Sequence, residues 1–189
     1  MFAFTWGCSP FDAIRRNCAT TLRQIKDHEV AVVFNAVGKI VFEEHGGGSS
    51  VDLGPYLDQI KQVDGATLVH NHPLGWRFEP NDSRHAGSSF SPEDIATACY
   101  AELAEVRAVG PRTGYSMRPA GDLRWNGDYW INAVEPTLKR HKASVIRSTL
   151  QAVSEHRTSR EAAEARFWHE VWQRVANDLL VIYQRFQDE

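Results

Sequence analysis

Hydrophobic and polar residues follow two different rhythms along this chain of 189 residues. Short apolar runs rich in β-branched residues, bounded by turn-forming residues, are typical of buried strands. Apolar residues spaced by three and four are typical of amphipathic helices. The short runs predict five strands, over residues 30–34, 39–42, 66–70, 115–118 and 123–125.

Helical spacing predicts two helices that each begin at a Ser-Pro pair. One starts at Ser9 and ends near residue 27, and the other starts at Ser91 and ends near residue 106. Ser is a favoured N-cap residue and Pro is favoured at the first helical position, so both pairs mark helix starts. A shorter helix is predicted within residues 51–63.

Two segments rich in turn-forming residues are predicted as loops, over residues 43–50 and 71–89. The first contains a glycine triplet, but no Lys follows at the spacing of a phosphate-binding loop, so we interpret it as a connector. Loops as long as the second are usually functional or disordered. Trp76 and Phe78 within it are interpreted as packing residues, with contact to a substrate as the alternative.

The composition changes after residue 127, and from about residue 133 the chain is predicted to be helical to its end. The pattern Thr158-Ser-Arg-Glu161 is a capping box that divides this region into two helices. The second helix carries one apolar stripe: Trp168, Val171, Trp172, Val175, Leu179, Ile182, Tyr183 and Phe186. We therefore divide the chain into a domain over residues 1–130 and a helical hairpin over residues 131–189, which packs on the domain or on a second copy.

Composition narrows the class of protein. The 42% of hydrophobic residues is ample for a packed core, and the net charge of −3 argues against nucleic-acid binding by bulk electrostatics. The three Cys residues form no Cys-x-x-Cys pair, so neither a disulfide framework nor a cysteine-based zinc site is expected. Neither a signal peptide nor an apolar run long enough to span a membrane is recognised, and we expect a cytoplasmic protein.

The candidate chemistry centres on His70-Asn71-His72-Pro73, which closes an apolar run. Alternate side chains share a face in extended backbone, so the two imidazoles should lie side by side. Asp94, in the first turn of the helix capped by Ser91, is a candidate third ligand. Three protein ligands with one open position is the catalytic arrangement of zinc. A helix start alone also explains Ser91 and Asp94, whose functional role depends on the two histidines.

Hydrolysis at such a site needs a general base, and three acidic residues precede the histidines. Glu29 comes directly before a predicted strand, whereas Glu43 and Glu44 adjoin a predicted loop. Spacing alone separates these candidates only narrowly. His28 is considered as a residue that supports the ligands, and Ser91 as a hydroxyl donor to a developing oxyanion.

These residues resemble the JAMM (MPN+, JAB) metalloproteases, and most closely their bacterial and phage-type branch. The resemblance covers about residues 9–125 and rests on His-Asn-His-Pro followed by Ser91-Pro-Glu-Asp94. It implies an α/β fold with a central mixed sheet flanked by helices, similar to cytidine deaminases. It also implies one Zn²⁺ bound by His70, His72 and Asp94, with Ser91 as oxyanion donor and Glu29, which opens the first strand, as the base rather than Glu43.

The resemblance further implies cleavage of an isopeptide or peptide bond after the tail of a ubiquitin-like protein. This sequence departs from the family in the segment between His72 and Ser91, whose eighteen residues are more than the family usually has. Such an insertion is tolerable because the cost of loop closure grows slowly with length. It would form a cover or a substrate-specific flap over the site.

Four other functions are considered. A catalytically silent domain of the same fold would act as a scaffold through its helical tail, and a DNA-repair-associated branch shares the JAB domain. An HNH nuclease requires a further His in the helix after the motif, and the helix after Ser91 contains none. A zinc deaminase is excluded because no Pro-Cys-x-x-Cys follows.

Overall fold

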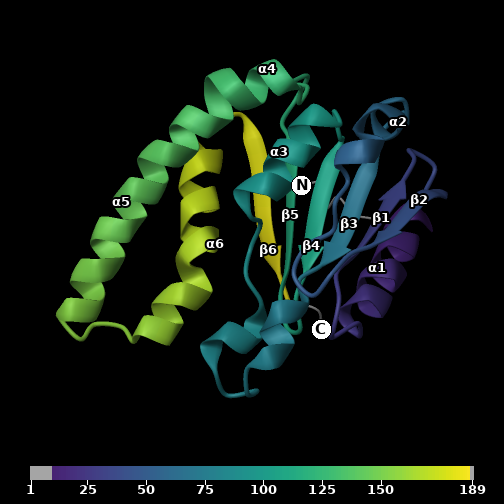
Figure 1. Cartoon of the computed structure of the whole chain (residues 1–189). Helices are drawn as coiled ribbons and strands as arrows, with labels where there is room; N and C mark the ends of the chain where they lie inside the picture. Colours follow the sequence, from purple (N-terminus) through teal and green to yellow (C-terminus); the bar gives the residue numbers. More distant parts are fainter. Residues whose placement is uncertain (1–9, 188–189) are drawn as a thin grey trace, which may run out of the picture.

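A six-stranded sheet with helices on both faces forms the centre of the computed structural model, which describes residues 10–187 (Figure 1). The strands, in order across the sheet, are β2 (Ile40–His45), β1 (Val30–Phe34), β3 (Thr67–Asn71), β4 (Glu105–Val109), β5 (Gly114–Pro119) and β6 (Val181–Phe186). Strands β3 and β4 are parallel, and every other neighbouring pair is antiparallel. The predicted α/β class with a mixed sheet is confirmed.

Helices cover the two faces unequally. Helix α1 (Pro10–Arg23) lies on one face, and α2 (Leu57–Lys61), α3 (Pro92–Tyr100) and α6 (Arg160–Asp178) lie on the other. The predicted N-cap of α1, Ser9, lies outside the described residues. A short helix α4 (Gly127–Tyr129) and a π-helical turn (Trp130–Val134) lead into α5 (Glu135–Ser154), which pairs with α6 as the predicted hairpin.

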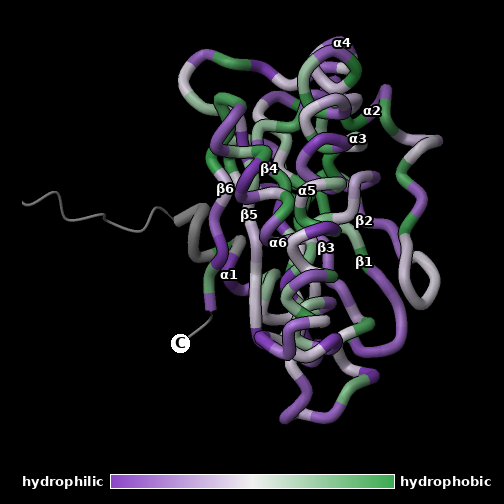
Figure 2. Tube along the Cα trace, turned by 90° about the vertical axis from the view of Figure 1, so that its left-hand side faces the viewer, coloured by the Kyte–Doolittle hydropathy of each residue, from purple (hydrophilic) through white to green (hydrophobic). Residues whose placement is uncertain are grey.

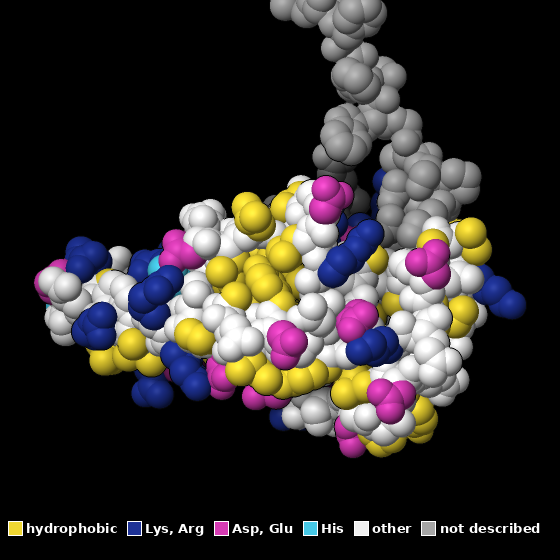
Figure 3. All heavy atoms as spheres, turned by 90° about the horizontal axis from the view of Figure 1, so that it is seen from above, with side chains coloured by type: hydrophobic (Ala, Val, Ile, Leu, Met, Phe, Trp, Pro, Cys, Tyr) yellow, Lys and Arg dark blue, Asp and Glu magenta, His cyan; other side chains and the backbone are white. Residues whose placement is uncertain are grey.

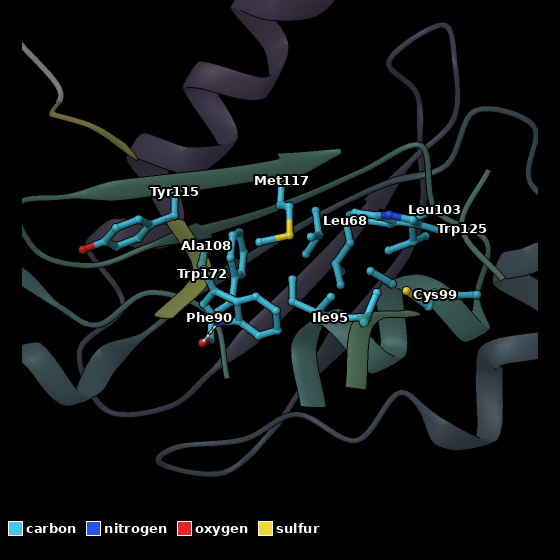
Figure 4. Close-up of a cluster of buried hydrophobic side chains, with 14 of the residues drawn as sticks. Leu68, Phe90, Ile95, Cys99, Leu103, Ala108, Tyr115, Met117, Trp125 and Trp172 are labelled. Carbon is cyan, nitrogen blue, oxygen red and sulfur yellow. Dashed lines mark hydrogen bonds between the residues drawn. The ribbon is translucent and has the colours of Figure 1, made fainter. Parts of the chain in front are cut away.

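Strand β1 is buried on both faces, which explains its unbroken apolar sequence. Val32 and Phe34 pack with Ala19 and Leu22 of α1. The side chains that alternate with them face the larger cluster on the other side of the sheet. Figure 4 shows that cluster, in which Trp172 of α6 lies against the sheet and its indole N–H donates to the carbonyl oxygen of Phe90 at 2.7 Å.

Three of the predicted helices end earlier than the sequence pattern indicated: α1 ends at Arg23 rather than near residue 27, and the differences in α3 and α6 are larger. Helix α3 ends at Tyr100 rather than near residue 106, because Glu102 adopts the left-handed conformation (φ 53°) and the chain turns into β4. In β4, Val106 and Ala108 face the core while Glu105 and Arg107 form an ion pair at 2.8 Å. The prediction of helix over residues 101–106 was therefore wrong.

The C-terminal prediction was also wrong in its last part. Helix α6 ends at Asp178, and residues 181–186 form β6, which pairs with β5 along its whole length. Because β6 takes the edge beside β5, residues 123–125 do not form the predicted strand, and Trp125 instead fills the core. The predicted loop at residues 43–50 likewise begins late, since β2 continues to His45. The chain beyond residue 130 is thus joined to the sheet by its final strand.

On the face that carries α4, acidic and basic side chains are mixed around an apolar patch, so this face carries no large area of one charge (Figure 3). The loops at the opposite end of the molecule are mostly hydrophilic (Figure 2). Among the described helices, none combines the length and the hydrophobicity that crossing a membrane would require.

Candidate metal centre

The ends of three elements meet at one edge of the sheet. Ala31 pairs with His70 across antiparallel strands, so Glu29, two residues before Ala31, lies at the level of His72, two residues after His70. The N-terminus of α3 brings Asp94 to the same place. One ligand atom from each of Glu29, His70, His72 and Asp94 lies within 4.8 Å of every other. The structure therefore brings together all four residues that the sequence suggested for the ligands and the base.

The two imidazoles and the Asp94 carboxylate face one another. The Nε2 atoms of His70 and His72 are 2.9 Å apart, and each lies 3.5 Å from one oxygen of Asp94. The Nδ1 atom of His72 lies 3.1 Å from the carbonyl oxygen of Ser88, which can only accept, so this nitrogen is the donor. In the neutral imidazole, the Nε2 lone pair of His72 then points into the cluster, as metal binding requires.

The donor set fits a metal ion. Imidazole nitrogen and carboxylate oxygen both bind Zn²⁺, and the group is largely buried, which limits competition from water. The Nδ1 atom of His70 is buried and has no hydrogen-bond partner in the described part of the chain. The Nε2 atom of His70 faces His72 and Asp94, so a cation between the rings would satisfy the inward nitrogens of both histidines. The group could therefore hold a metal ion.

The charges within the cluster shift the pKa values of His72 and Asp94. Burial alone would lower the pKa of His72, but its hydrogen bond to Asp94 and the charges of Asp94 and Glu29 outweigh burial and raise the pKa to about 9. Burial alone would raise the pKa of Asp94, yet the two histidines hold it well below its usual value. Without metal, the site is thus an imidazolium–carboxylate pair at neutral pH, and a metal ion must displace a proton to bind.

Glu29 is the carboxylate suited to proton transfer. Its side chain is only 5% exposed, and this burial raises its pKa, against the opposing effect of His70 and His72. A raised pKa brings a carboxylate closer to the pH at which a general base works efficiently. Asp94, by contrast, accepts a hydrogen bond from the Ser91 backbone N–H at 2.7 Å and stays ionised.

Ser91 and Asp94 form a reciprocal capping box at the start of α3. The Ser91 hydroxyl oxygen accepts from the Asp94 backbone N–H at 3.1 Å, which leaves its own proton available. Ser91, Glu29, His72 and Asp94 all line one cavity of about 380 Å³. Pro92 at the first helical position fixes the backbone that leads into the cap.

Asn71, between the two histidines, holds the backbone on either side of Glu29, the candidate base. Its side chain lies on the other face of β3, where its carbonyl oxygen accepts from the Val30 N–H at 2.6 Å and its amide donates to the carbonyl oxygens of Ile25 and His28. These bonds fix the turn before β1 on either side of Glu29. Sequence reasoning missed this role, although an Asn buried in a strand is a signal, because its amide must find partners.

The segment between His72 and Ser91 lines part of the cavity through Pro73, Leu74, Ser88 and Ser89. It contains two short 3₁₀ helices, Pro73–Arg77 and Ser83–Ala86. Arg84 binds Asp82 at 2.7 Å and reaches Glu164 of α6 at 3.4 Å. Trp76 donates to the Arg23 carbonyl oxygen, so its packing against the domain, the favoured interpretation, agrees with the structure.

The C-terminal region also reaches the cavity, which the sequence did not suggest. Trp168 of α6 lines the cavity together with Val51 and Ser88. The Tyr183 hydroxyl of β6 lies 2.8 Å from the Ser89 hydroxyl and 2.8 Å from Nδ1 of His169. This trio ties β6 and α6 to the segment whose Ser88 carbonyl orients His72.

Comparisons with models of protein families, with curated proteins and with solved structures give no match. The chemistry of the site therefore rests on its geometry and on the resemblance in sequence.

Proposed function

We propose that the protein is a zinc-dependent metallopeptidase of the JAMM type. The observation that supports this most strongly is the convergence of a buried carboxylate, Glu29, with His70, His72 and Asp94 at an open cavity. A purely structural ion pair would not require a second, buried carboxylate of raised pKa beside it. The JAB-type fold suggested by the sequence is part of this proposal.

In this proposal His70, His72 and Asp94 hold one Zn²⁺, which when bound polarises the scissile carbonyl and lowers the pKa of water in its open position. Glu29 accepts the proton of the attacking water and delivers it to the amine as the carbon–nitrogen bond breaks. The Ser91 hydroxyl, whose oxygen is held by the Asp94 N–H, donates to the developing oxyanion. The Ser88 carbonyl keeps His72 in the tautomer that presents Nε2 inward.

The proposed substrate is the extended tail of a ubiquitin-like protein or its conjugate. The lining of the cavity includes Ser49, Ser50, Val51 and Trp168, and this mixture of small polar and apolar side chains suits an extended chain with small side chains. The helical hairpin is proposed to contact a partner or a second copy through the exposed side of α5, where Ile146 and Leu150 are 40% and 65% exposed.

The proposal is tested by metal content and cleavage measured together. Purified protein is analysed for zinc, stripped with a chelator and reloaded, and each form is incubated with fusions in which a ubiquitin-like tail precedes a reporter. We expect one zinc ion per chain, and cleavage that the chelator abolishes and zinc restores. Bound zinc without cleavage of any fusion would favour the silent scaffold, and absence of zinc uptake would refute the metal site.

A further inference from the structure

A second pair of histidines lies outside the centre described above, where the turn before β1 meets the end of β2. His28 directly precedes Glu29, and His45 is the last residue of β2, paired in register with Val30. Their ring centroids are 5.4 Å apart at an interplanar angle of 26°, so the rings meet through their edges. The Nε2 atom of His28 and the Nδ1 atom of His45 are 3.2 Å apart.

A carboxylate holds the far nitrogen of each ring. Asp27 Oδ1 lies 2.8 Å from Nδ1 of His28, and Glu43 Oε1 lies 3.0 Å from Nε2 of His45. An ionised carboxylate only accepts hydrogen bonds, so both of these nitrogens are donors. In neutral rings, the two remaining nitrogens are therefore lone pairs that point at each other. This arrangement is repulsive unless a proton or a metal ion lies between the two nitrogens, and a metal ion that binds there takes the place of the proton.

We propose that His28 and His45 bind a divalent late transition-metal ion at a second site. The nitrogens of two imidazoles on one ion are about 2.8 Å apart at a right angle and about 3.3 Å apart in tetrahedral geometry, for metal–nitrogen bonds of about 2.0 Å. The observed 3.2 Å falls within this range. A carboxylate that accepts from the far nitrogen is the usual support of a metal-binding histidine, and here both rings have one.

This second site differs from the first in its exposure. The side chains of His28 and His45 are 35% and 56% exposed, so water completes the coordination and the ion exchanges with solvent. A site of two imidazoles and water favours ions that bind nitrogen strongly. Its affinity is expected to be higher for Cu²⁺ than for either Ni²⁺ or Zn²⁺. The two sites share no ligand.

The ion would join two segments on either side of the candidate base. Glu29 donates its N–H to the Gly47 carbonyl oxygen, and its own carbonyl oxygen accepts from the Gly46 N–H, both at 2.8 Å. A cation between His28 and His45 closes the same turn through side chains. Its binding therefore stabilises the end of the β1–β2 hairpin against local opening.

Copper binding tests the proposal without any measurement of hydrolysis. Wild type and the variants His28→Gln, His45→Gln and His156→Asn are dialysed against Cu²⁺, and bound metal is counted per chain. His156 is the control, because it is exposed between α5 and α6, and Asn tolerates its positive φ of 55°. We expect wild type and the control to bind one more ion than either His28→Gln or His45→Gln.

Two further readouts accompany the count. Wild type and the His156→Asn control should each bind one additional copper ion. The electron paramagnetic resonance spectrum of that ion should show coupling to imidazole nitrogens. Added copper should raise the Tm of wild type more than that of His45→Gln, whereas without metal the two proteins should melt alike. Equal copper counts in wild type, His28→Gln and His45→Gln would overturn the second site, whatever the outcome for peptidase activity.

Discussion

We expect the replacement of Glu29 by Gln to separate the proposed catalysis from metal binding. The side chain keeps its size but loses the ability to accept and release a proton. A positioned general base contributes roughly 10²–10⁴ in rate, which corresponds to about 2.7–5.4 kcal/mol at about 1.4 kcal/mol for each factor of ten. We therefore expect kcat/KM for a cleaved fusion to fall by roughly 10²–10⁴.

The structure gives reasons to expect a loss of this size without unfolding. Asp94 is held by the Ser91 N–H and by the histidines, so it does not replace the lost base. Burial raises the pKa of Glu29, which means that folding disfavours its ionised form and that this penalty is present once the pH exceeds its unfolded pKa. Gln carries no charge, so the metal-free variant should melt at the same temperature as wild type or higher near neutral pH.

The assay combines kcat/KM, zinc content and thermal melting for Glu29→Gln. Glu44→Gln is the matched control, because Glu44 is half-buried in β2 and lies outside both the group of four and the lining of the cavity. The control should keep activity and zinc. Cleavage by Glu29→Gln within tenfold of wild type would refute the assignment of the base, and loss of zinc would instead make Glu29 a ligand.

Three other predictions follow from the geometry. In the metal-free protein, Asp94 and Glu29 raise the pKa of His72 to about 9, so zinc must displace a proton from His72 when it binds at neutral pH. The apparent affinity for zinc, measured by calorimetry, should therefore rise about tenfold per pH unit between about pH 6 and pH 8, and an affinity that does not change with pH would contradict this. Asn71→Ala leaves the Val30 N–H and the His28 carbonyl oxygen unsatisfied, at roughly 1–3 kcal/mol each, which denaturant unfolding should register. Tyr183→Phe removes the hydroxyl that joins Ser89 to His169 and should lower the free energy of unfolding by roughly 1–3 kcal/mol, whereas an unchanged midpoint would mean that the trio contributes nothing.

Local patterns were sufficient for the elements that surround the site. β1 could be predicted because both of its faces are buried and its sequence is continuously apolar. The start of α3 was predictable because Ser91 and Pro92 encode a cap within four residues. His70 and His72 lie one residue apart in a strand, so their proximity also follows from local geometry.

The missed strands depend on neighbours that are distant in sequence. β4 has the sequence Glu-Val-Arg-Ala-Val, which includes good helix formers, and only its place between β3 and β5 makes it a strand. In β6, the spacing of Ile182, Tyr183 and Phe186 continues the stripe of α6, so periodicity cannot reveal the break after Asp178. Pairing with the open edge of β5 decides the outcome.

The same reason explains which site residues were missed. Trp168 lines the cavity from more than seventy positions beyond Asp94, and nothing in the stripe of α6 distinguishes it from a core residue. The length of the segment after His72 predicts a cover or a flap, but it did not indicate that His85 is buried and bonded to the Phe78 carbonyl oxygen at 2.9 Å. The polar composition of this segment gives no sign of that burial.

The capping box shows why the structural and functional interpretations of Asp94 are not alternatives. One carboxylate oxygen accepts the Ser91 N–H at 2.7 Å, and this bond orients the group so that each oxygen lies 3.5 Å from one imidazole. The positive end of the α3 dipole favours the ionised carboxylate, and so does each imidazole. Helix capping therefore aims the carboxylate before any metal binds, and the ligand needs no further residue to position it. A sequence signal as local as Ser-Pro-Glu-Asp can position a candidate metal ligand because the same bond starts the helix and directs the side chain.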